Sequence, residues 1–205
     1  KSVTANMLTA YYSRGCDSAD MFNNLDISKY ADYKEHLNKY DVIHLDIQWC
    51  IEPAGGVENV VSYISESTIA ELREYYPDII SRDAVSLPET LSQINTMTGS
   101  KFIVIVDEWD VLIRDENTNS RIQNEYISFL RAMFKGTEPT KYIQLAYMTG
   151  ILPIKKQKTQ SALNNFKDYS MLYAGPLASY IGFTEDEVQQ LCDVYNEDYE
   201  EVRRW

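Results

Sequence analysis

The sequence contains little cysteine, and its three cysteines are widely separated. Cys16, Cys50 and Cys192 form no Cys-x-x-Cys spacing, and no pair of histidines lies close to any of them. These features argue against a structural zinc site. An odd number of isolated cysteines instead predicts free thiols, which are typical of a protein in the reducing cytoplasm.

Long apolar runs are also missing. A membrane-spanning helix requires about 18 or more consecutive apolar residues, whereas the longest aliphatic stretch here is Phe102 to Val106. The first residues contain no apolar segment of the kind found in secretory signals. We therefore predict a cytoplasmic protein with no membrane partner.

Positive charge is scarce. The chain has 19 lysines and arginines against 31 aspartates and glutamates, which gives a formal net charge of −12. Such a surface repels phosphate backbones and excludes a broad electrostatic footprint for nucleic acid. One local basic strip, at Lys155, Lys156 and Lys158, has two interpretations: a nucleic-acid contact or a solvated loop.

The sequence does contain a regular alternation of apolar runs and amphipathic segments, with enough residues for one substantial core. Short apolar runs predict strands at residues 41–46, 102–106 and 142–148. Helical periodicity predicts helices at residues 2–13, 27–40, 57–76, 86–99, 120–134 and 184–195. Strands that alternate with helices indicate an α/β fold with a mostly parallel, doubly wound sheet, in which the second and third strands are central.

The stretch from Phe102 to Glu108 carries the clearest chemical signal. Five apolar residues are followed by Asp107 and Glu108, the pattern known as Walker B. A buried parallel strand delivers its last residues to the edge of the sheet where ligands bind. Asp107 would hold a Mg²⁺ ion there, and Glu108 would activate a water molecule as general base. The alternative is that these two acids only begin a loop or cap the next helix.

Lys1 and Ser2 stand directly before the first predicted helix. A phosphate-binding P-loop ends in Gly-Lys-Ser/Thr at a helix N-terminus, where amide groups hold phosphate, the lysine reaches the β- and γ-phosphates and the hydroxyl binds Mg²⁺. Lys1 and Ser2 fit the last two positions of such a loop. We therefore expect the chain to begin inside its P-loop and to lack the P-loop strand.

Thr149 follows the strand predicted at residues 142–148 and precedes Gly150. In P-loop proteins with an additional strand between the P-loop and the Walker B strand, the next strand ends in a polar residue that senses the γ-phosphate. Thr149 occupies that position. Its alternative interpretation is an ordinary turn residue at the end of a strand.

Residues 1–8, 102–110, 147–155 and 182–188 together resemble the AAA-ATPase-like family of bacterial P-loop ATPases. The resemblance extends over essentially the whole chain and implies a three-layer P-loop NTPase core with ATP and Mg²⁺ as ligands. Matched position by position, it implies nucleotide contacts from Lys1, Ser2 and Thr149. It implies metal contacts from Ser2 and Asp107, with Glu108 as the catalytic base. The core is expected over residues 1–175, and residues 176–205 are expected to begin a C-terminal helical region.

The resemblance also implies an activity and partners. We expect an ATP-hydrolysing module that drives a conformational change in an attached domain, which in this family is often a C-terminal nuclease-like domain. The alternative is a non-catalytic module that uses nucleotide as a switch or serves as a protein-interaction surface. An oligomer is compatible with both, and Arg114 and Arg131 are candidates for an arginine that acts on a neighbouring subunit's nucleotide. His44 is interpreted as a core histidine with a satisfied hydrogen bond.

Overall fold

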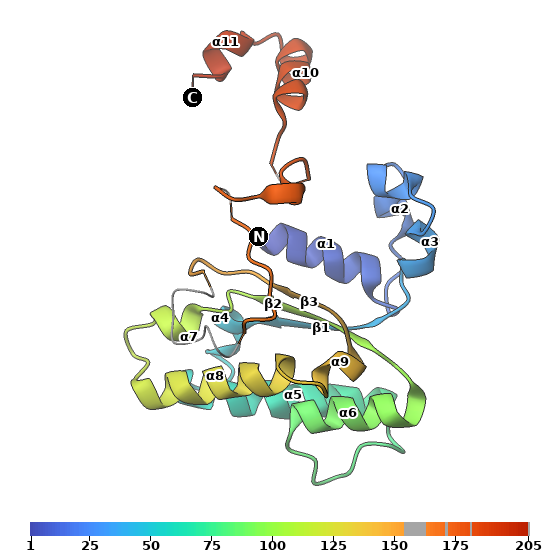
Figure 1. Ribbon diagram of the computed structural model, residues 1–205, viewed down its shortest axis with the longest axis vertical. Helices are drawn as coiled ribbons and strands as arrows, with labels where there is room; N and C mark the ends of the chain where they lie inside the picture. Colours follow the sequence, from blue (N-terminus) through green and yellow to red (C-terminus); the bar gives the residue numbers. More distant parts are fainter. Residues whose placement is uncertain (154–162, 171, 181, 205) are drawn as a thin grey trace. The chain divides into compact units, whose positions relative to one another are not determined.

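The chain divides into two compact units, Lys1–Asn165 and Phe166–Trp205 (Figure 1). The first unit contains the sheet and every predicted site residue. The computed structural model describes residues 1–153, 163–170, 172–180 and 182–204.

The three predicted strands are confirmed and form one parallel sheet in the order β1-β2-β3. Among them, β2 is central and all six of its residues are buried, as its unbroken apolar run predicts. β3, predicted as a second central strand, pairs only with β2 among the described residues, and its Leu145 is 38% exposed. The strands are β1 (Asp41–Asp46), β2 (Phe102–Asp107) and β3 (Ile143–Met148).

Helices cover both faces of the sheet (Figure 1). On one face lies α1 (Ser2–Tyr12), whose Ala5 packs against Ile103 and Ile105 of β2. The other face is covered by three helices that contact one another. These are α5 (Val60–Tyr75), α6 (Leu87–Thr98) and α8 (Ser120–Phe134). A parallel α/β sheet covered in this way is compatible with a P-loop-like core.

The start of α8 and the end of α6 carry residues that suit a helix end. The side chain of Asn119 accepts hydrogen bonds from the N–H groups of Arg121 and Ile122 at the start of α8. α6 ends at Gly99, whose φ of 74° is a left-handed conformation that glycine adopts without strain. Ser86 occupies the predicted N-cap of α6 but makes no side-chain capping hydrogen bond.

The prediction of one helix at residues 27–40 is wrong. This segment instead contains short turns, because an aromatic cluster of Tyr11, Phe22 and Tyr33 is buried beneath it. Asn38 has a φ of 56°, and its side-chain amide donates to two carbonyl oxygens at the end of α1 and just beyond it, each at 3.0 Å. These tertiary contacts override local helix propensity. The short helices there are η1 (Asp26–Lys29) and α3 (Tyr33–His36), and α2 (Ala19–Phe22) precedes the segment.

The remaining elements are short, apart from one helix in the second unit. That helix begins with the predicted capping box, in which the Thr184 N–H donates to Glu187 Oε2 at 2.7 Å and the Glu187 N–H donates to Thr184 Oγ1 at 3.3 Å. No helix in the described part of the chain is long and apolar enough to cross a membrane. The short elements of the first unit are α4 (Ile47–Cys50), η2 (Val57–Asn59), α7 (Val111–Arg114) and α9 (Pro139–Tyr142). Those of the second unit are η4 (Gly175–Leu177), α10 (Glu185–Tyr195) and α11 (Tyr199–Val202).

Candidate functional site

The last residue of β2 places a carboxylate at the edge of the sheet. Asp107 is 3% exposed and lies on the same face as Ile103 and Ile105, because alternate residues of a strand face the same side. That face is the one covered by α1. The Asp107 carboxylate is therefore buried between the sheet and α1, at the strand ends where parallel sheets bind ligands.

Thr149 directly follows β3 and bonds to Asp107. Its hydroxyl donates to Asp107 Oδ1, and its N–H donates to the carbonyl oxygen of Val106 at 2.9 Å. The Trp109 N–H then donates to the carbonyl oxygen of Thr149, also at 2.9 Å. Because backbone pairing continues past the ends of both strands, both the backbone and the side chain of Thr149 are fixed.

The first turn of α1 adds a second hydroxyl to this cluster. The hydroxyl of Ser2 lies near enough to the Asp107 carboxylate to lower its pKa, and the hydroxyl of Thr4 lies near Tyr147 of β3. Lys1 is the exposed N-cap residue, and no side chain caps α1 among the described residues. The first amide groups of a helix have no partner within it and carry a partial positive charge, so this end of α1 is suited to an anion.

Several neighbours favour the charged form of Asp107. Burial opposes its ionisation, but the hydroxyls of Ser2 and Thr149, the N–H of Glu108 and the nearby His44 together lower the pKa of Asp107 below its usual value. The cluster therefore holds a carboxylate anion in a largely buried position.

Glu108 is next to Asp107, but its side chain is bound elsewhere. Its φ of 51° is a left-handed conformation that is uncommon for a residue with a side chain. Glu108 Oε2 accepts a hydrogen bond from Arg114 Nη2 at 2.8 Å, and Arg114 Nε donates to Asp110 Oδ2 at 2.9 Å. Arg114 is thus engaged within its own chain, whereas the sequence suggested that it could act on a neighbouring subunit. Arg131, the other candidate, is exposed on α8.

Asp110 is an organising residue that the sequence analysis missed. It is fully buried, and besides Arg114 its carboxylate accepts the N–H of Leu152 at 2.7 Å and the N–H of Ile151 at 3.2 Å. Asp110 therefore ties the loop after β3 to the loop after β2. The four-residue spacing between Asp110 and Arg114 is the sequence signal that could have revealed their ion pair.

Gly150 lies where these two loops meet. A Cβ atom at this position would lie 2.5 Å from the side chain of Trp109 and 2.6 Å from Asp110 Oδ1. Both neighbours are buried, so neither can move aside easily. The glycine after Thr149 is consequently required by packing, since its backbone φ is not in the left-handed region.

Comparison with known proteins identifies the chain's relatives. Residues 1–159 match the model of a family described as predicted AAA-ATPase. The chain belongs to this AAA-ATPase-like family. It is also similar to an uncharacterized protein in the vnfD 5′ region of Azotobacter chroococcum mcd 1, with 27% identity over 120 residues. The match covers 57% of this chain and 23% of that protein's length. No solved structure matches the chain.

Membership in the AAA-ATPase-like family implies nucleotide binding. Of the predicted site residues, Ser2, Asp107 and Thr149 lie in one polar cluster in which Thr149 bonds to Asp107, with Lys1 beside it at the start of α1. Glu108 is adjacent in the backbone but paired with Arg114. The basic strip at residues 155–158 lies outside the described residues. Within the described ranges, no group of three or more His, Cys, Asp or Glu side chains could by itself hold a metal ion.

Proposed function

We propose that this chain carries the ATP-hydrolysing site of an ATPase. The observation that supports this most directly is the convergence of two hydroxyls, from Ser2 and Thr149, on the ionised carboxylate of Asp107. These three residues come from different elements of the fold, α1, β2 and the end of β3. If Asp107 only began a loop and Thr149 were only a turn residue, nothing would require their side chains to meet that of Ser2.

The start of α1 supplies groups suited to phosphate. Its first amide groups and the ammonium group of Lys1 would bind phosphate oxygens, as at the helix that follows a P-loop. The oxygen atoms of Ser2 and Asp107 would hold Mg²⁺, which usually binds proteins through one or two such ligands and completes its shell with phosphates and water. When bound, this ion neutralises negative charge on the phosphate oxygens.

Glu108 is the proposed general base. Its carboxylate would accept the proton of the water molecule that attacks the γ-phosphate. In the structure its side chain is 28% exposed and is held by Arg114, so Glu108 must leave this ion pair or share it with water. Thr149 would hold Asp107 in place and contact the phosphate end of the nucleotide.

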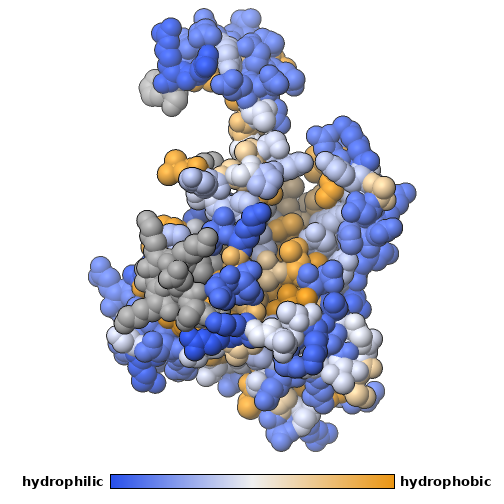
Figure 2. Space-filling model, in the orientation of Figure 1, coloured by the Kyte–Doolittle hydropathy of each residue, from blue (hydrophilic) through white to orange (hydrophobic). Residues whose placement is uncertain are grey.

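The edge of β3 is the proposed position of the P-loop strand. Figure 2 shows an apolar area on the first unit between α1 and α8, where β3 runs. Leu145 of β3 is an exposed apolar residue. A strand that precedes the P-loop would lead directly into α1 and could pair with this edge. We further propose that the ATPase core extends over residues 1–175 and that hydrolysis moves a domain attached beyond the helices of residues 176–205.

The ion pair of Glu108 also favours a second candidate function. If Arg114 keeps Glu108 away from water in the nucleotide complex, the chain acts as a non-catalytic switch that binds nucleotide without turnover. The two functions share the cluster around Asp107 and differ in what Glu108 does.

Calorimetry with Mg²⁺-ATP tests the nucleotide site. It would compare this chain with a version extended upstream to include a strand and a glycine-rich loop. We expect the extended version to bind and Asp107→Asn in that version to weaken binding. If neither version bound Mg²⁺-ATP, the proposed function would be contradicted.

Glu108→Gln then separates turnover from switching. In the extended version, we expect ATP to bind while hydrolysis falls by about 10²- to 10⁴-fold, because a general base contributes that much. Glu116→Gln, an exposed glutamate in the following loop, makes the same charge change and should leave hydrolysis unaltered. If the extended version without substitutions bound ATP but showed no measurable turnover, the switch would be favoured.

A further inference from the structure

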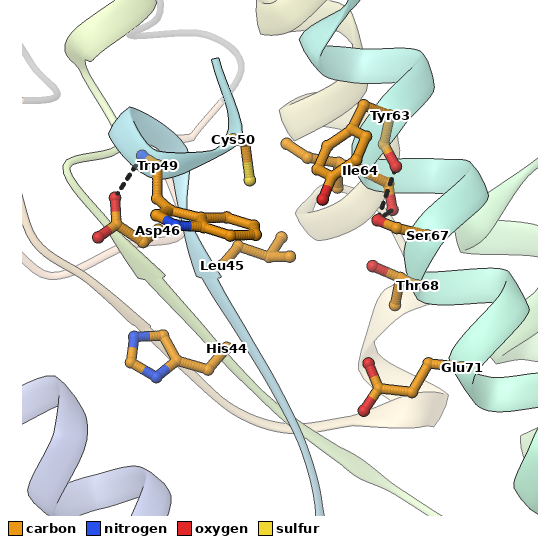
Figure 3. Close-up of a pocket in the computed structure, with 10 residues that line it drawn as sticks. All are labelled: His44, Leu45, Asp46, Trp49, Cys50, Tyr63, Ile64, Ser67, Thr68 and Glu71. Atoms are coloured by element: carbon orange, nitrogen blue, oxygen red, sulfur yellow. Dashed lines mark hydrogen bonds between the residues drawn. The ribbon is translucent and has the colours of Figure 1, made fainter. Parts of the chain in front are cut away.

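A groove of the first unit runs along the outer edge of β1, and the proposed nucleotide site does not use it. Its cavity has a volume of about 410 Å³ and is lined by His44, Leu45 and Asp46 on one side (Figure 3). Consecutive residues of a strand face opposite sides of the sheet, so three in a row can line one cavity only along the strand's edge. The opposite wall is a stripe of α5 at four-residue spacing, formed by Tyr63, Ser67 and Glu71.

In the part of the chain that the structure describes, no strand lies beside the edge of β1 that faces this groove. Within the described sheet, β1 pairs with β2 alone. An edge strand presents unpaired N–H and C=O groups that can bind another extended segment. A groove between an edge strand and a helix can therefore accept a peptide that adds one strand to the sheet and places alternate side chains in the groove.

The chemistry of the groove selects basic side chains. Asp46 and Glu71 are both exposed, and neither has an ion-pair partner in the described ranges. In Figure 3 the carboxylate of Glu71 extends from α5 toward β1, and the indole of Trp49 lies near Leu45. Trp49 is 64% exposed, and an indole face of this kind attracts lysine and arginine.

The imidazole of His44 does not compete for this space. His44 Nδ1 shares a hydrogen bond of 3.0 Å with Thr9 Oγ1, which confirms the hydrogen bond predicted for this residue. Thr9 belongs to α1, on the other face of the sheet from α5. Among the described residues that line the groove, the carboxylates of Asp46 and Glu71 therefore give it its negative charge.

We propose that the groove between β1 and α5 binds an extended segment of a partner protein that carries lysine or arginine at alternate positions. The segment pairs with the outer edge of β1, and one basic side chain reaches Glu71 while another lies over Trp49. A second copy of this chain fits less well, because each copy has a net charge of −12 and the two would repel each other. This groove adjoins the proposed nucleotide site, because Asp46 pairs in register with Asp107, but Lys1, Ser2, Asp107, Glu108 and Thr149 do not line it.

Fluorescence anisotropy with a labelled peptide, Thr-Val-Lys-Val-Lys-Val-Thr, tests the proposal. We expect this peptide to bind the chain and Glu71→Gln to weaken binding about tenfold, through loss of a charge-assisted contact. Glu66→Gln, at an exposed position of α5 outside the groove, makes the same charge change and should alter affinity less than twofold. Equal losses for the two variants would show attraction by bulk charge and would overturn the proposal.

A second peptide tests strand pairing. The same sequence with N-methyl groups on alternate backbone amides keeps its charges but cannot form the ladder, and we expect about tenfold weaker binding. Hydrogen exchange should slow at the amides of residues 42–46 with the unmodified peptide only. Equal binding of both peptides, or no binding of either at millimolar concentration, would overturn the proposal. Self-association in sedimentation that Glu71→Gln abolishes would also overturn it, because a second copy would then be the occupant.

Discussion

The two faces of the sheet are covered in different ways. The face under α5, α6 and α8 is packed with fully buried apolar side chains, among them Ile64, Leu91 and Ile94. On the other face, the single helix α1 contributes Ala5 to a small core and then brings polar groups to Asp107. Stability and chemistry are therefore divided between the faces: three helices hold β2 in place, and one helix brings binding groups to its end.

Truncation of the three-helix face should have the largest effect on stability. Leu91 of α6 is completely buried, so Leu91→Ala should lower the free energy of unfolding by about 2–5 kcal/mol, from lost burial and a new cavity. Met97→Ala, on the same helix but 68% exposed, should change it by less than about 0.5 kcal/mol. Urea denaturation followed by circular dichroism measures both. Equal effects would mean that α6 does not support the core.

Gly150→Ala tests the packing between the loops that follow β2 and β3. A Cβ atom there meets Trp109 and Asp110, so overpacking should lower the free energy of unfolding by about 1–3 kcal/mol. Gly15→Ala is the matched control, because its added Cβ would be 3.7 Å from Ser13 Oγ, an ordinary contact. If thermal denaturation showed the two variants to be equally stable, the loops after β2 and β3 would be more loosely packed than described.

Thr149→Val should have a smaller effect on stability but a specific effect on the α1 face. The valine keeps the shape and removes the hydroxyl that donates to Asp107, which should cost about 1 kcal/mol. Without that hydrogen bond the pKa of Asp107 should rise, which NMR titration of the carboxyl carbon can measure. Thr96→Val, at an exposed position of α6, serves as the control. An unchanged pKa of Asp107 would show that the Thr149 hydroxyl does not stabilise the Asp107 carboxylate.

The last test changes the protein least, because it labels cysteine thiols and replaces no residue. All three cysteines are free thiols, as predicted. Cys16 is exposed, whereas Cys50 is buried in α4, which contacts α5. Burial, with a smaller effect of Asp46, raises the pKa of Cys50 to about 11. A thiol reagent at pH 8 should therefore label Cys16 rapidly and leave Cys50 unmodified, as peptide mass spectrometry can show. Rapid labelling of Cys50 would indicate that the α4–α5 side opens readily.

Much of the fold could be predicted from the sequence, because its strands and long helices are defined by local apolar patterns. Phe102 to Val106 is a buried strand in any parallel sheet, and the spacing of apolar residues in α8 is evident without a structure. The segment at residues 27–40 could not be predicted in this way. Its conformation depends on Tyr11 and Asn38, whose partners are distant in the sequence.

The candidate site shows the same division. Asp107, Ser2 and Thr149 were recognised because motifs place them at element ends, and the structure brings them together, although their roles remain predictions. The part played by Asp110 was missed, because a buried carboxylate that binds the amides of Ile151 and Leu152 has no local signature. The groove beside β1 was missed for a related reason: it depends on how far α5 lies from a strand edge.

The parallel order of the strands also has a consequence for how the chain folds. The first residue of β1 pairs with Phe102, 61 positions later (102 − 41), and Phe102 pairs with Ile143, 41 positions later (143 − 102). Compared with a four-residue hairpin, closing these loops costs about 2 kcal/mol more for each ladder. Neither ladder of the described sheet joins strands that are close in the sequence, so we expect folding on the slow side for a domain of this size. During synthesis, β1 stays unpaired until β2 has left the ribosome. Sheet formation therefore begins only when β2 is available, because β2 pairs with both other strands.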